Sequence, residues 1–258
     1  GKTTFAHRLG IHLRVAGFEH SYLGMDDYFK DVEEIEIDPE TGMKNFESLA
    51  AVHVDLLATR CRALLRGDAI PKRHFDFESH RGIDHPTETV ALRSDEFLII
   101  EGIHMLNPQL TGAIGAEDVF RVFISPLCCV NLDDTHPVAT SDVRLLRRMV
   151  RDYKYRGYGA KETLDRWQSV REGEHLYIFP HQSQADFFFN SVLYYELPVL
   201  AQYAIPLLLE VQGSPALLQT ANRLLTICQC LYPVPEYSIP GTSLLREFIG
   251  GSDWDVHH

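Results

Sequence analysis

The sequence of 258 residues is poor in cysteine and contains no long apolar run. Its five cysteines form no Cys-x-x-Cys pair and no regular framework, which favours free thiols in a reducing cytoplasm. No stretch approaches the roughly 20 apolar residues of a membrane span, and no secretory signal opens the chain. Internal repeats and low-complexity segments are absent as well. These absences predict a cytoplasmic globular protein that does not act in a membrane.

Positive charge is also scarce. The chain carries 24 Lys and Arg against 36 Asp and Glu, a formal net charge of −12 at pH 7. A protein that coats nucleic acid needs a broad basic face, so this balance argues against nucleic acid as a direct partner. An ATP-binding protein with the same balance must concentrate its positive charge locally. The length suits one large α/β domain, or one domain with an appendage.

The first residues, Gly1-Lys2-Thr3-Thr4, open directly into a helical pattern that reaches about residue 16 and is closed by Gly17. Gly-Lys-Thr before a helix is the last part of a phosphate-binding loop. In such a loop, backbone N–H groups and the Lys surround a triphosphate and the hydroxyl ligates Mg²⁺. The tripeptide also occurs at ordinary helix starts, so the rest of the chain has to decide between the two interpretations.

Acidic residues stand near the carboxyl ends of two apolar runs. Asp26 and Asp27 follow a predicted strand of residues 21–25, and Glu101 follows four apolar residues in the predicted strand 96–104. In an open α/β sheet, ligands bind outside the carboxyl ends of the strands. An acid beside a phosphate loop can hold Mg²⁺ or its water shell. The alternatives are that the aspartates only begin a turn and that Glu101 is only a strand-terminal charge.

An arginine cluster supplies the local positive charge. Four arginines recur at i, i+3, i+4 and i+7 on one face of a predicted helix: Arg144, Arg147, Arg148 and Arg151. Four apolar residues form the other face: Leu145, Leu146, Met149 and Val150. Stacked arginines repel one another unless an anion lies between them, which favours a phosphate partner over a solvated basic face. Thr140, Ser141 or Asp142 is predicted to cap the helix. A hinge at Arg156-Gly157 would make its end part of a lid.

The remaining patterns predict the other elements. The acidic segment 31–41 is predicted to be a mobile loop, and Ser48 is predicted to cap a helix of residues 49–66. Two alternating runs, 74–81 and 88–92, are expected to pair as a hairpin. Further strands are expected at 119–124 and 185–191, and further helices at 161–177, 198–211 and 215–231. The phenylalanines of 185–191, together with Trp167 and Val170, are expected in the core.

Taken in order, the motifs resemble the uridine kinase and phosphoribulokinase group of P-loop kinases. The matching segments are Gly1-Lys2-Thr3-Thr4, Asp26-Asp27-Tyr28-Phe29, Asn45-Phe46-Glu47, Phe75-Asp76-Phe77-Glu78-Ser79-His80, Glu101-Gly102-Ile103-His104, Arg147-Arg148-Met149-Val150-Arg151-Asp152, Arg156-Gly157 and Ala185-Asp186. They cover roughly residues 1 to 190, and their joint order is more specific than any one of them. The C-terminal part, with Tyr195-Glu196-Leu197, resembles bacterial uridine-kinase-like nucleoside kinases.

This resemblance implies an α/β fold of the P-loop NTPase class, with a central parallel sheet flanked by helices, a small β-hairpin and a helical lid. The kinase domain would span residues 1–212, with the hairpin insert at about 68–94 and the lid at about 142–160, and a helical appendage would span 213–258. In similar proteins the kinase often follows a module like the N-terminal region of threonyl-tRNA synthetase, and the resemblance leaves open whether such an upstream module is fused here. The C-terminal helices would cover the sheet or build a homo-oligomer; periodicity does not choose between these.

The resemblance also implies the co-substrates and the catalytic residues. ATP would be bound by Gly1, Lys2, Thr3, Thr4 and Arg148, and Mg²⁺ by Thr3 and Glu101. Asp26 would accept the proton from the 5′-hydroxyl of a nucleoside as that hydroxyl attacks the γ-phosphorus. Arg151 and Arg156 would close over the phosphates and offset developing charge.

The nucleoside is expected to contact Asp26 and a second group of residues: Phe46, Glu47, Phe75, His80, Arg148 and Arg151. Phe75 would stack on the base and His80 would bond a pyrimidine carbonyl. Phe75 replaces a tyrosine that is usual in uridine kinases, and Tyr158 stands where an arginine often follows Arg-Gly. Both departures bear on pyrimidine selection.

Uridine is the acceptor that these motifs favour, with two alternatives. One is a kinase of the same fold that acts on a sugar phosphate or on pantothenate. Residues 31–40 carry five acids and no basic residue, which disfavours a sugar phosphate. The other is a nucleotide-binding regulatory protein without turnover. Retention of Lys2, Thr3, Asp26 and Glu101 weighs against it, because a protein that only binds nucleotide needs no base.

Overall fold

Two apolar runs of the sequence, residues 20–24 and 97–101, pair as parallel strands, in keeping with the predicted α/β class. The computed structural model describes residues 1–37, 44–77, 79–115 and 117–254. These residues form two compact units, each with its own hydrophobic core. The first unit consists of Gly1, Ile124–Arg171 and the chain from Phe188 onwards, and the second consists of Lys2–Phe123 and Glu172–Phe187. The predicted division near residue 212 stays a prediction.

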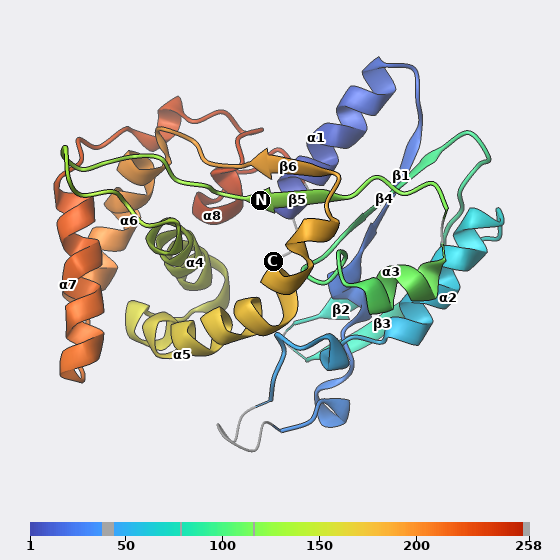
Figure 1. Cartoon of the computed structure of the whole chain (residues 1–258), viewed down its shortest axis with the longest axis horizontal. Helices are drawn as coiled ribbons and strands as arrows, with labels where there is room; N and C mark the ends of the chain where they lie inside the picture. Colours follow the sequence, from blue (N-terminus) through green and yellow to red (C-terminus); the bar gives the residue numbers. More distant parts are fainter. Residues whose placement is uncertain (38–43, 78, 116, 255–258) are drawn as a thin grey trace. The chain divides into compact units, whose positions relative to one another are not determined.

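In the second unit, helix α1 (Lys2–Val15) leads into strand β1 (His20–Gly24), which pairs in parallel with β4 (Phe97–Glu101) (Figure 1). Gly17 follows the helix with a φ of +90°, a left-handed conformation that glycine adopts without steric cost. The register aligns Gly24 with Glu101, so the carboxyl ends of both strands lie at one edge. This pair is the parallel part of the expected sheet.

Short turns and a hairpin complete the second unit, and their bounds are η1 (Met25–Tyr28), η2 (Val32–Glu34), β2 (Ile70–Asp76), β3 (Arg81–Val90), α3 (Pro108–Ile114), η4 (Glu174–Ile178) and η5 (Phe179–Gln184). A hairpin is present within the predicted insert of about 68–94, with β2 and β3 antiparallel, but the predicted pairing of residues 74–81 with 88–92 is wrong. Residues 74–76 pair with 81–83, because the run 74–81 contains the turn itself, and residues 70–71 pair with 89–90. Within the predicted acidic loop, residues 32–34 form the turn η2, which Asp31 caps. Residues 38–41 of that loop, and Glu78, lie outside the described residues.

The prediction of one continuous helix from residue 49 is wrong. The segment forms a 3₁₀ turn and a shorter helix, η3 (Leu49–Ala51) and α2 (Val54–Leu65). Between them Val52 is extended and pairs with Phe29 in an antiparallel bridge, a long-range contact that interrupts the helix. The Ser48 hydroxyl accepts a hydrogen bond from the N–H of Ala50, so Ser48 caps η3 and not α2.

A charged network joins the hairpin to α2. Asp84 on β3 accepts hydrogen bonds from Arg60 on α2 at 2.5 Å and from Arg73 on β2 at 3.1 Å. Both guanidinium groups lie over the ring of Tyr28, at 5.6 and 6.0 Å from its centroid. Arg60 is buried, and a buried charge costs free energy unless a partner offsets it. Asp84 therefore holds two basic side chains in place at once.

The stabilising effect of Asp84 is expected to depend on pH. Hydrogen bonds from Arg60 and then Arg73 hold the pKa of Asp84 below its ordinary value, although partial burial opposes this. A lowered folded-state pKa gives stability that is complete above the unfolded pKa of about 3.9 and is lost as the pH falls through the folded pKa. We therefore expect Asp84→Asn to lower the urea midpoint at pH 7 and to differ less from wild type at pH 3. An equal difference at both pH values would contradict this linkage.

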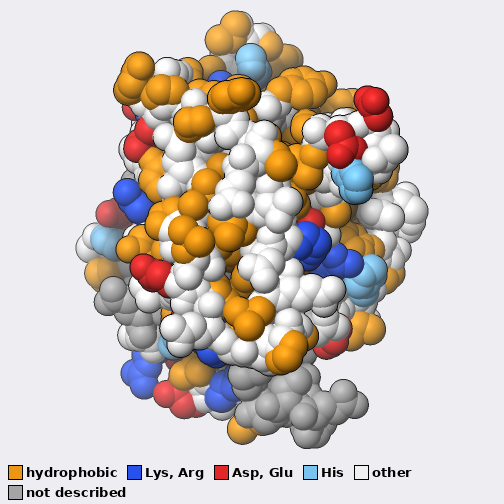
Figure 2. Space-filling view, turned by 90° about the vertical axis from the view of Figure 1, so that its left-hand side faces the viewer, with side chains coloured by type: hydrophobic (Ala, Val, Ile, Leu, Met, Phe, Trp, Pro, Cys, Tyr) orange, Lys and Arg blue, Asp and Glu red, His pale blue; other side chains and the backbone are white. Residues whose placement is uncertain are grey.

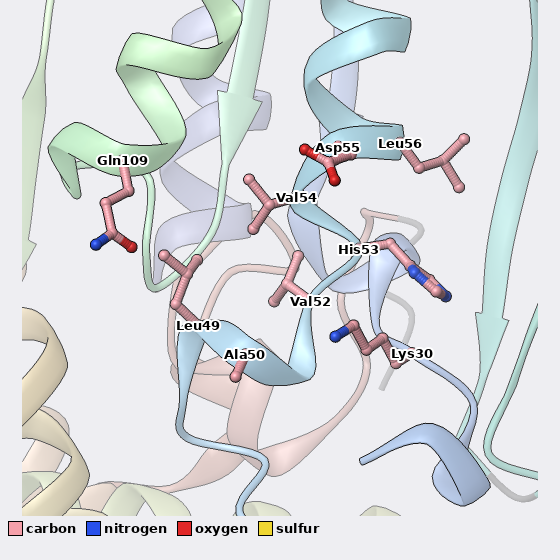
Figure 3. A pocket seen from close by; sticks show the side chains of 9 residues that line it. All are labelled: Lys30, Leu49, Ala50, Val52, His53, Val54, Asp55, Leu56 and Gln109. Atoms are coloured by element: carbon pink, nitrogen blue, oxygen red, sulfur yellow. The ribbon is translucent and has the colours of Figure 1, made fainter. Parts of the chain in front are cut away.

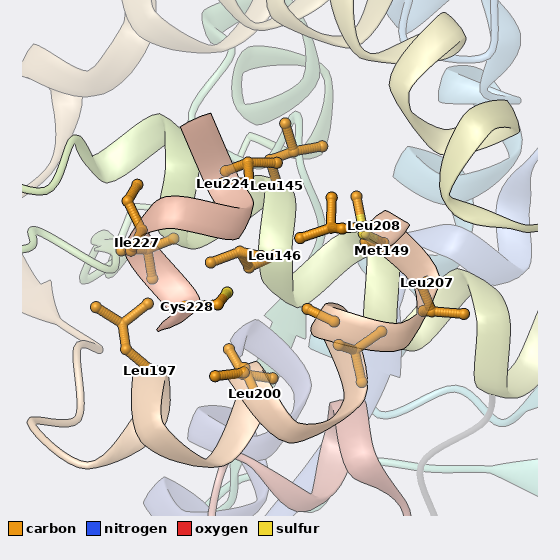
Figure 4. Close-up of a cluster of buried hydrophobic side chains, with 14 of the residues drawn as sticks. Leu145, Leu146, Met149, Leu197, Leu200, Leu207, Leu208, Leu224, Ile227 and Cys228 are labelled. Atoms are coloured by element: carbon orange, nitrogen blue, oxygen red, sulfur yellow. The ribbon is translucent and has the colours of Figure 1, made fainter. Parts of the chain in front are cut away.

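Helices dominate the first unit, and their bounds are α4 (Thr140–Arg156), α5 (Ala160–Gly173), α6 (Glu196–Leu209), α7 (Pro215–Gln229), α8 (Arg246–Ile249) and the short turn η6 (Glu236–Ser238). Figure 4 shows the core between them, where Leu145 and Met149 of α4 lie among side chains of α6 and α7. The predicted apolar face of α4 is confirmed, since its leucines, Met149 and Val150 are all buried. Val170 is buried and Trp167 packs against this core, as expected.

The arginine face of α4 is smaller than predicted. Arg147 is 5% exposed; its guanidinium lies 2.5 Å from the carboxylate of Glu196 and donates to the carbonyl of Ser191 at 2.9 Å. The prediction that Arg147 belongs to the outward basic face is therefore wrong. Its position borders the apolar stripe that packs on α6, and a charge buried there requires an internal partner.

Two other expectations for the helices are wrong. Helix α4 begins after Ala139 without a side-chain cap, and Asp142 is buried and pairs with Arg223 of α7 instead. A buried carboxylate is stabilised more by a charge-assisted hydrogen bond from a guanidinium than by the N–H groups of an exposed helix end. The helix expected at 161–177 stops at Gly173, and the following turn, η4, has the wider π-helical bonding.

The phenylalanines near residue 188 are not core residues. Strands β5 (Val122–Ser125) and β6 (Phe187–Asn190) form a two-stranded sheet, and Phe187, Phe188 and Phe189 are 51%, 51% and 36% exposed. The prediction that they are buried is wrong. A sheet of two strands offers little surface of its own for burying aromatic rings.

Helices long and apolar enough to cross a membrane are not found within the described ranges.

All five cysteines are free, and burial raises the pKa of Cys61 and Cys228 to about 12, which keeps both thiols protonated and unreactive. Figure 2 shows the face on which α7 lies in Figure 1, where hydrophobic side chains are spread among neutral polar groups.

Candidate active site

Three side chains meet where α1 begins and β4 ends. The hydroxyl of Thr3 donates a hydrogen bond of 2.8 Å to Oε1 of Glu101, and the Nζ atom of Lys2 lies 4.0 Å from Oε2 of the same carboxylate. Lys2 and Thr3 occupy the first turn of α1, and Glu101 is the last residue of β4. The structure thus joins two motifs that lie 98 residues apart in the chain.

Tyr22 is a fourth member of this group that the sequence analysis missed. Its hydroxyl donates a second hydrogen bond of 2.8 Å to Oε1 of Glu101, and His7 stacks on its ring at 5.3 Å. Burial, together with the charge and hydrogen bond of Glu101, raises the pKa of Tyr22 above its ordinary value, so the hydroxyl stays a donor. The alternation of side chains along β1 could have indicated Tyr22, because Tyr22 lies on the same face of the strand as Gly24, and Gly24 is the register partner of Glu101.

The residues at this point fit a divalent cation. Oε2 of Glu101 is buried and has no hydrogen-bond partner among the described residues, so its lone pairs are available to coordinate a metal. Mg²⁺ prefers a few hard oxygen ligands and takes the rest from phosphates and water, which a hydroxyl and one carboxylate satisfy. Within the described ranges, no group of three or more His, Cys, Asp or Glu could hold a metal by itself. A metal here would therefore arrive with the phosphates.

Asp26 and Asp27 begin the turn η1 directly after β1, and they are placed differently. The carboxylate of Asp27 accepts a hydrogen bond from the N–H of Phe75 at 3.3 Å and lies 3.5 Å from Nδ1 of His74, while its carbonyl accepts from Arg73 at 2.9 Å. Asp27 therefore anchors the hairpin to the end of β1. Asp26 is half-buried at the same strand end, and its role as the base stays a prediction.

Gly102 allows the two strand ends to approach closely. A Cβ atom at Gly102 would lie only 2.3 Å from the Cβ of Met25, the residue that precedes Asp26. Met25 is fully buried and its Cβ is fixed by the backbone, so it cannot move aside. A glycine after Glu101 is thus needed to bring Glu101 and Asp26 to the same place on the sheet edge.

The predicted base-binding residues lie around the end of the hairpin. The rings of Phe46 and His80 are 5.8 Å apart. His80 has a φ of +54°, and its buried Nδ1 has no partner among the described residues. The ring of Phe75 is 1% exposed and packs on Phe29 and Phe77 at 5.7 and 5.1 Å. Stacking of a base on Phe75 stays a prediction, and it requires one of these rings to move.

Glu47 is packed next to a buried histidine. The backbone of Glu47 and the backbone of Tyr177 face the ring of His104, which is 1% exposed. Burial, with a smaller contribution from the nearby His181, lowers the pKa of His104 to about 4. His104 is therefore neutral at physiological pH, and it lies beside the segment that carries Glu47, one of the residues predicted to contact the nucleoside. The sequence analysis noted His104 only as part of the Glu101-Gly102-Ile103-His104 segment.

The remaining predicted site residues are placed as follows. Thr4 is buried beside Thr3 in the first turn of α1, and its part in ATP binding stays a prediction. Arg148, Arg151 and Arg156 belong to the first unit together with Gly1, whereas the residues around Glu101 belong to the second. The three arginines converge on the buried carboxylate of Asp152.

A surface pocket lies elsewhere in the second unit and contains none of the predicted site residues. Figure 3 shows Lys30, His53 and Asp55 around it, with Leu49, Val52 and Gln109 among the other residues that line it. The His53 ring lies 3.2 Å from the carboxylate of Glu34. No motif of the sequence marked this pocket.

Comparison with known proteins identifies the family. The family model described as "Phosphoribulokinase / Uridine kinase family" matches residues 1–197. The chain belongs to this family. Family membership makes it a kinase, and thus a transferase, with a P-loop fold, and it confirms the resemblance predicted from the motifs.

Individual relatives agree with this assignment. A uridine kinase of Halalkalibacterium halodurans is 26% identical over 187 residues, which are 72% of this chain and 78% of that protein. A uridine kinase of Staphylococcus haemolyticus is 28% identical over 187 residues, covering 72% and 80%. Among solved structures, a candidate fructose transport system kinase from Silicibacter sp. TM1040 superposes with a TM-score of 0.51 at 18% identity, over 73% of this chain and 84% of that one. This structural likeness shows the fold of the kinase family.

Proposed function

We propose that this kinase transfers the γ-phosphoryl group of ATP, with Mg²⁺, to the 5′-hydroxyl of a nucleoside, with uridine as the preferred acceptor, in the reducing cytoplasm. The observation that carries the proposal is the convergence of Lys2, Thr3 and Tyr22 on Glu101, at the sheet edge where Asp26 leaves β1. The names of the curated relatives support uridine as the acceptor.

Each residue of this group has a role that follows from its contacts. Lys2 is the basic side chain that lies beside Glu101 in the described residues. Its ammonium group would offset negative charge on the β and γ phosphates. Tyr22 and Thr3 both bond Oε1 of Glu101, which orients Oε2 away from them. Thr3 and Glu101 would hold Mg²⁺, which when bound neutralises charge on the phosphates.

Asp26 is the proposed general base. The transition state of phosphoryl transfer is loose, so the attacking hydroxyl needs orientation more than strong deprotonation. A carboxylate at the carboxyl end of β1 can accept the hydroxyl proton as the bond to phosphorus forms. Its neighbour Asp27 accepts a hydrogen bond from the N–H of Phe75 and so anchors the hairpin.

The direct test measures ADP release with ATP and Mg²⁺ across uridine, cytidine, other nucleosides, pantothenate and ribulose 5-phosphate. We expect turnover with uridine or cytidine, and a loss of about 10²–10³-fold in kcat for Lys2→Met, because a preorganised charge on the phosphates is removed. Mass spectrometry of the phosphorylated acceptor separates transfer from simple ATP hydrolysis.

The other outcomes are equally informative. Turnover with pantothenate or ribulose 5-phosphate alone would replace the nucleoside as the acceptor. If ATP binds but no acceptor on the panel supports turnover, the proposed activity is wrong and a nucleotide-binding regulatory protein becomes the better account.

A further inference from the structure

The two oxygens of the Glu101 carboxylate have different surroundings. Oε1 accepts two hydrogen bonds of 2.8 Å, from the hydroxyls of Thr3 and Tyr22. Oε2 is buried and accepts no hydrogen bond from the described residues; the Nζ atom of Lys2 lies 4.0 Å from it, beyond hydrogen-bond distance. One oxygen of this carboxylate is therefore occupied, and the other is available to a ligand.

The Tyr22 hydroxyl reaches Oε1 from the neighbouring strand. Tyr22 is the register partner of Ile99, so its backbone lies two residues, roughly 6.6 Å, before Glu101 along the sheet. A side chain as long as that of tyrosine is needed to span this offset. The ring of His7 on α1 stacks on the Tyr22 ring, with centroids 5.3 Å apart and planes 21° from parallel, and this contact helps to fix the direction of the hydroxyl.

The two hydroxyls on Oε1 have different roles once a metal binds. Thr3 is a proposed metal ligand, so its oxygen would contact the metal directly. Tyr22 is not a proposed ligand, and it would remain a hydrogen-bond donor to the carboxylate from outside the coordination sphere. Donors of this kind fix the orientation of a ligating side chain, and losing one typically costs about 10–100-fold in metal affinity. Tyr22 is thus the group that keeps Oε1 hydrogen-bonded while Oε2 coordinates.

A carboxylate with one available oxygen suits Mg²⁺ better than Ca²⁺. Mg²⁺ requires nearly ideal octahedral geometry, and it takes one or two carboxylates together with phosphates and water. Ca²⁺ accepts about six to eight oxygen ligands in flexible geometry and can bind both oxygens of one carboxylate. The hydrogen bond from Tyr22 opposes that second mode at Glu101, which removes an advantage that Ca²⁺ would otherwise have.

We propose that Tyr22 determines the metal selectivity of this kinase: by occupying Oε1 of Glu101 it restricts this carboxylate to coordination through Oε2, and so favours Mg²⁺ over Ca²⁺ at the phosphates of ATP. The inference rests on the proposed function for the nucleotide and the metal. Its new content is that Tyr22 is a positioning residue, which acts through Glu101 and selects between two cations of the same charge.

Nucleotide binding tests this selectivity without turnover. Titration calorimetry compares the Kd of ATP in saturating Mg²⁺, in saturating Ca²⁺ and in EDTA, for wild type and Tyr22→Phe. We expect Tyr22→Phe to lower the ratio of ATP affinity in Mg²⁺ to ATP affinity in Ca²⁺ by about tenfold or more, the effect of one lost hydrogen bond to a charged ligand group. Affinity in EDTA should not change, because the hydroxyl acts on the metal ligand and not on the phosphates.

Tyr203→Phe is the matched control, since it removes the same kind of hydrogen bond elsewhere. The Tyr203 hydroxyl donates to the carboxylate of Glu236, and both residues belong to the first unit, whereas Tyr22 and Glu101 belong to the second. We expect Tyr203→Phe to leave the ratio of ATP affinities in Mg²⁺ and Ca²⁺ unchanged. A comparable fall in that ratio would show a general effect of losing a tyrosine hydroxyl and contradict the specific role of Tyr22.

Several results would overturn the proposal. An unchanged ratio in Tyr22→Phe would refute it, and an equal loss of affinity in Mg²⁺, Ca²⁺ and EDTA would show a structural role alone. Wild-type ATP affinity that does not depend on the metal would also refute it. If Tyr22→Phe does not fold, His7→Leu replaces it: this variant removes the ring stacked on Tyr22 and should lower the same ratio, so no change there would contradict the proposal. Failure of the acceptor panel with metal-dependent ATP binding would refute the proposed function and leave this inference intact.

Discussion

Replacing Asp26 with asparagine is expected to lower kcat for the acceptor by about 10²–10⁴-fold, the usual contribution of a positioned general base. Asparagine has nearly the same shape and still accepts a hydrogen bond, but it cannot take the hydroxyl proton. ATP affinity should change little, because Lys2 and Thr3 are untouched and lie on α1. Steady-state kinetics with uridine and calorimetry with ATP measure the two quantities separately.

Asp27→Asn is the matched control, because it makes the same chemical change one residue away. Asp27 contacts the N–H of Phe75 and the ring of His74, so its replacement should loosen the hairpin. We expect a lower thermal midpoint with kcat far less affected than in Asp26→Asn. A larger fall in kcat for Asp27→Asn than for Asp26→Asn would assign the base to Asp27 and refute the proposed arrangement.

The second large effect concerns stability. Removing one partner of the buried pair between Arg147 and Glu196 is expected to cost about 3–5 kcal/mol in the free energy of unfolding, because it leaves an uncompensated buried charge. Both side chains are almost fully buried, and Nε and Nη2 of Arg147 lie 2.6 and 2.5 Å from Oε2 of Glu196. Burial raises the pKa of Glu196, and Arg147 opposes that shift. The pair therefore offsets a large desolvation cost.

Urea unfolding of Arg147→Met, Glu196→Met and the double variant tests this directly. The double variant should lose much less stability than the sum of the single ones, since no charge is left buried. Lys161→Ala breaks an exposed pair with Asp165 on α5 and serves as the control, expected to change stability by about 0.5 kcal/mol or less. Additive losses for Arg147 and Glu196 would show that the pair does not act as a unit.

The sequence was sufficient for those features that depend on local pattern. The apolar face of α4 and the parallel strands that end near Asp26 and Glu101 were predicted from periodic and apolar patterns, which backbone geometry imposes wherever the chain is helical or extended. The family followed from the order of short motifs, and the match over residues 1–197 confirms it.

Features that depend on contacts between distant residues were not predicted. Whether an arginine faces solvent is decided by what packs beside it, so Arg147, one of four in a regular row, became an internal partner of Glu196, 49 residues away. Val52 is extended and not helical because it pairs with Phe29. The aromatic rings near residue 188 are exposed because β6 belongs to a sheet of only two strands, which offers little surface to cover them.

The sequence by itself determined the family and the kinase class, and it predicted which side chains would carry the chemistry. Only the tertiary structure decided that Tyr22 joins Thr3 on Glu101, and that Asp152 gathers three arginines. The physical reason is that hydrogen bonds and charge pairs act over a few ångströms, while the residues that form them can lie tens of positions apart. Spacing along the chain shows which groups are present, and folding decides which of them meet.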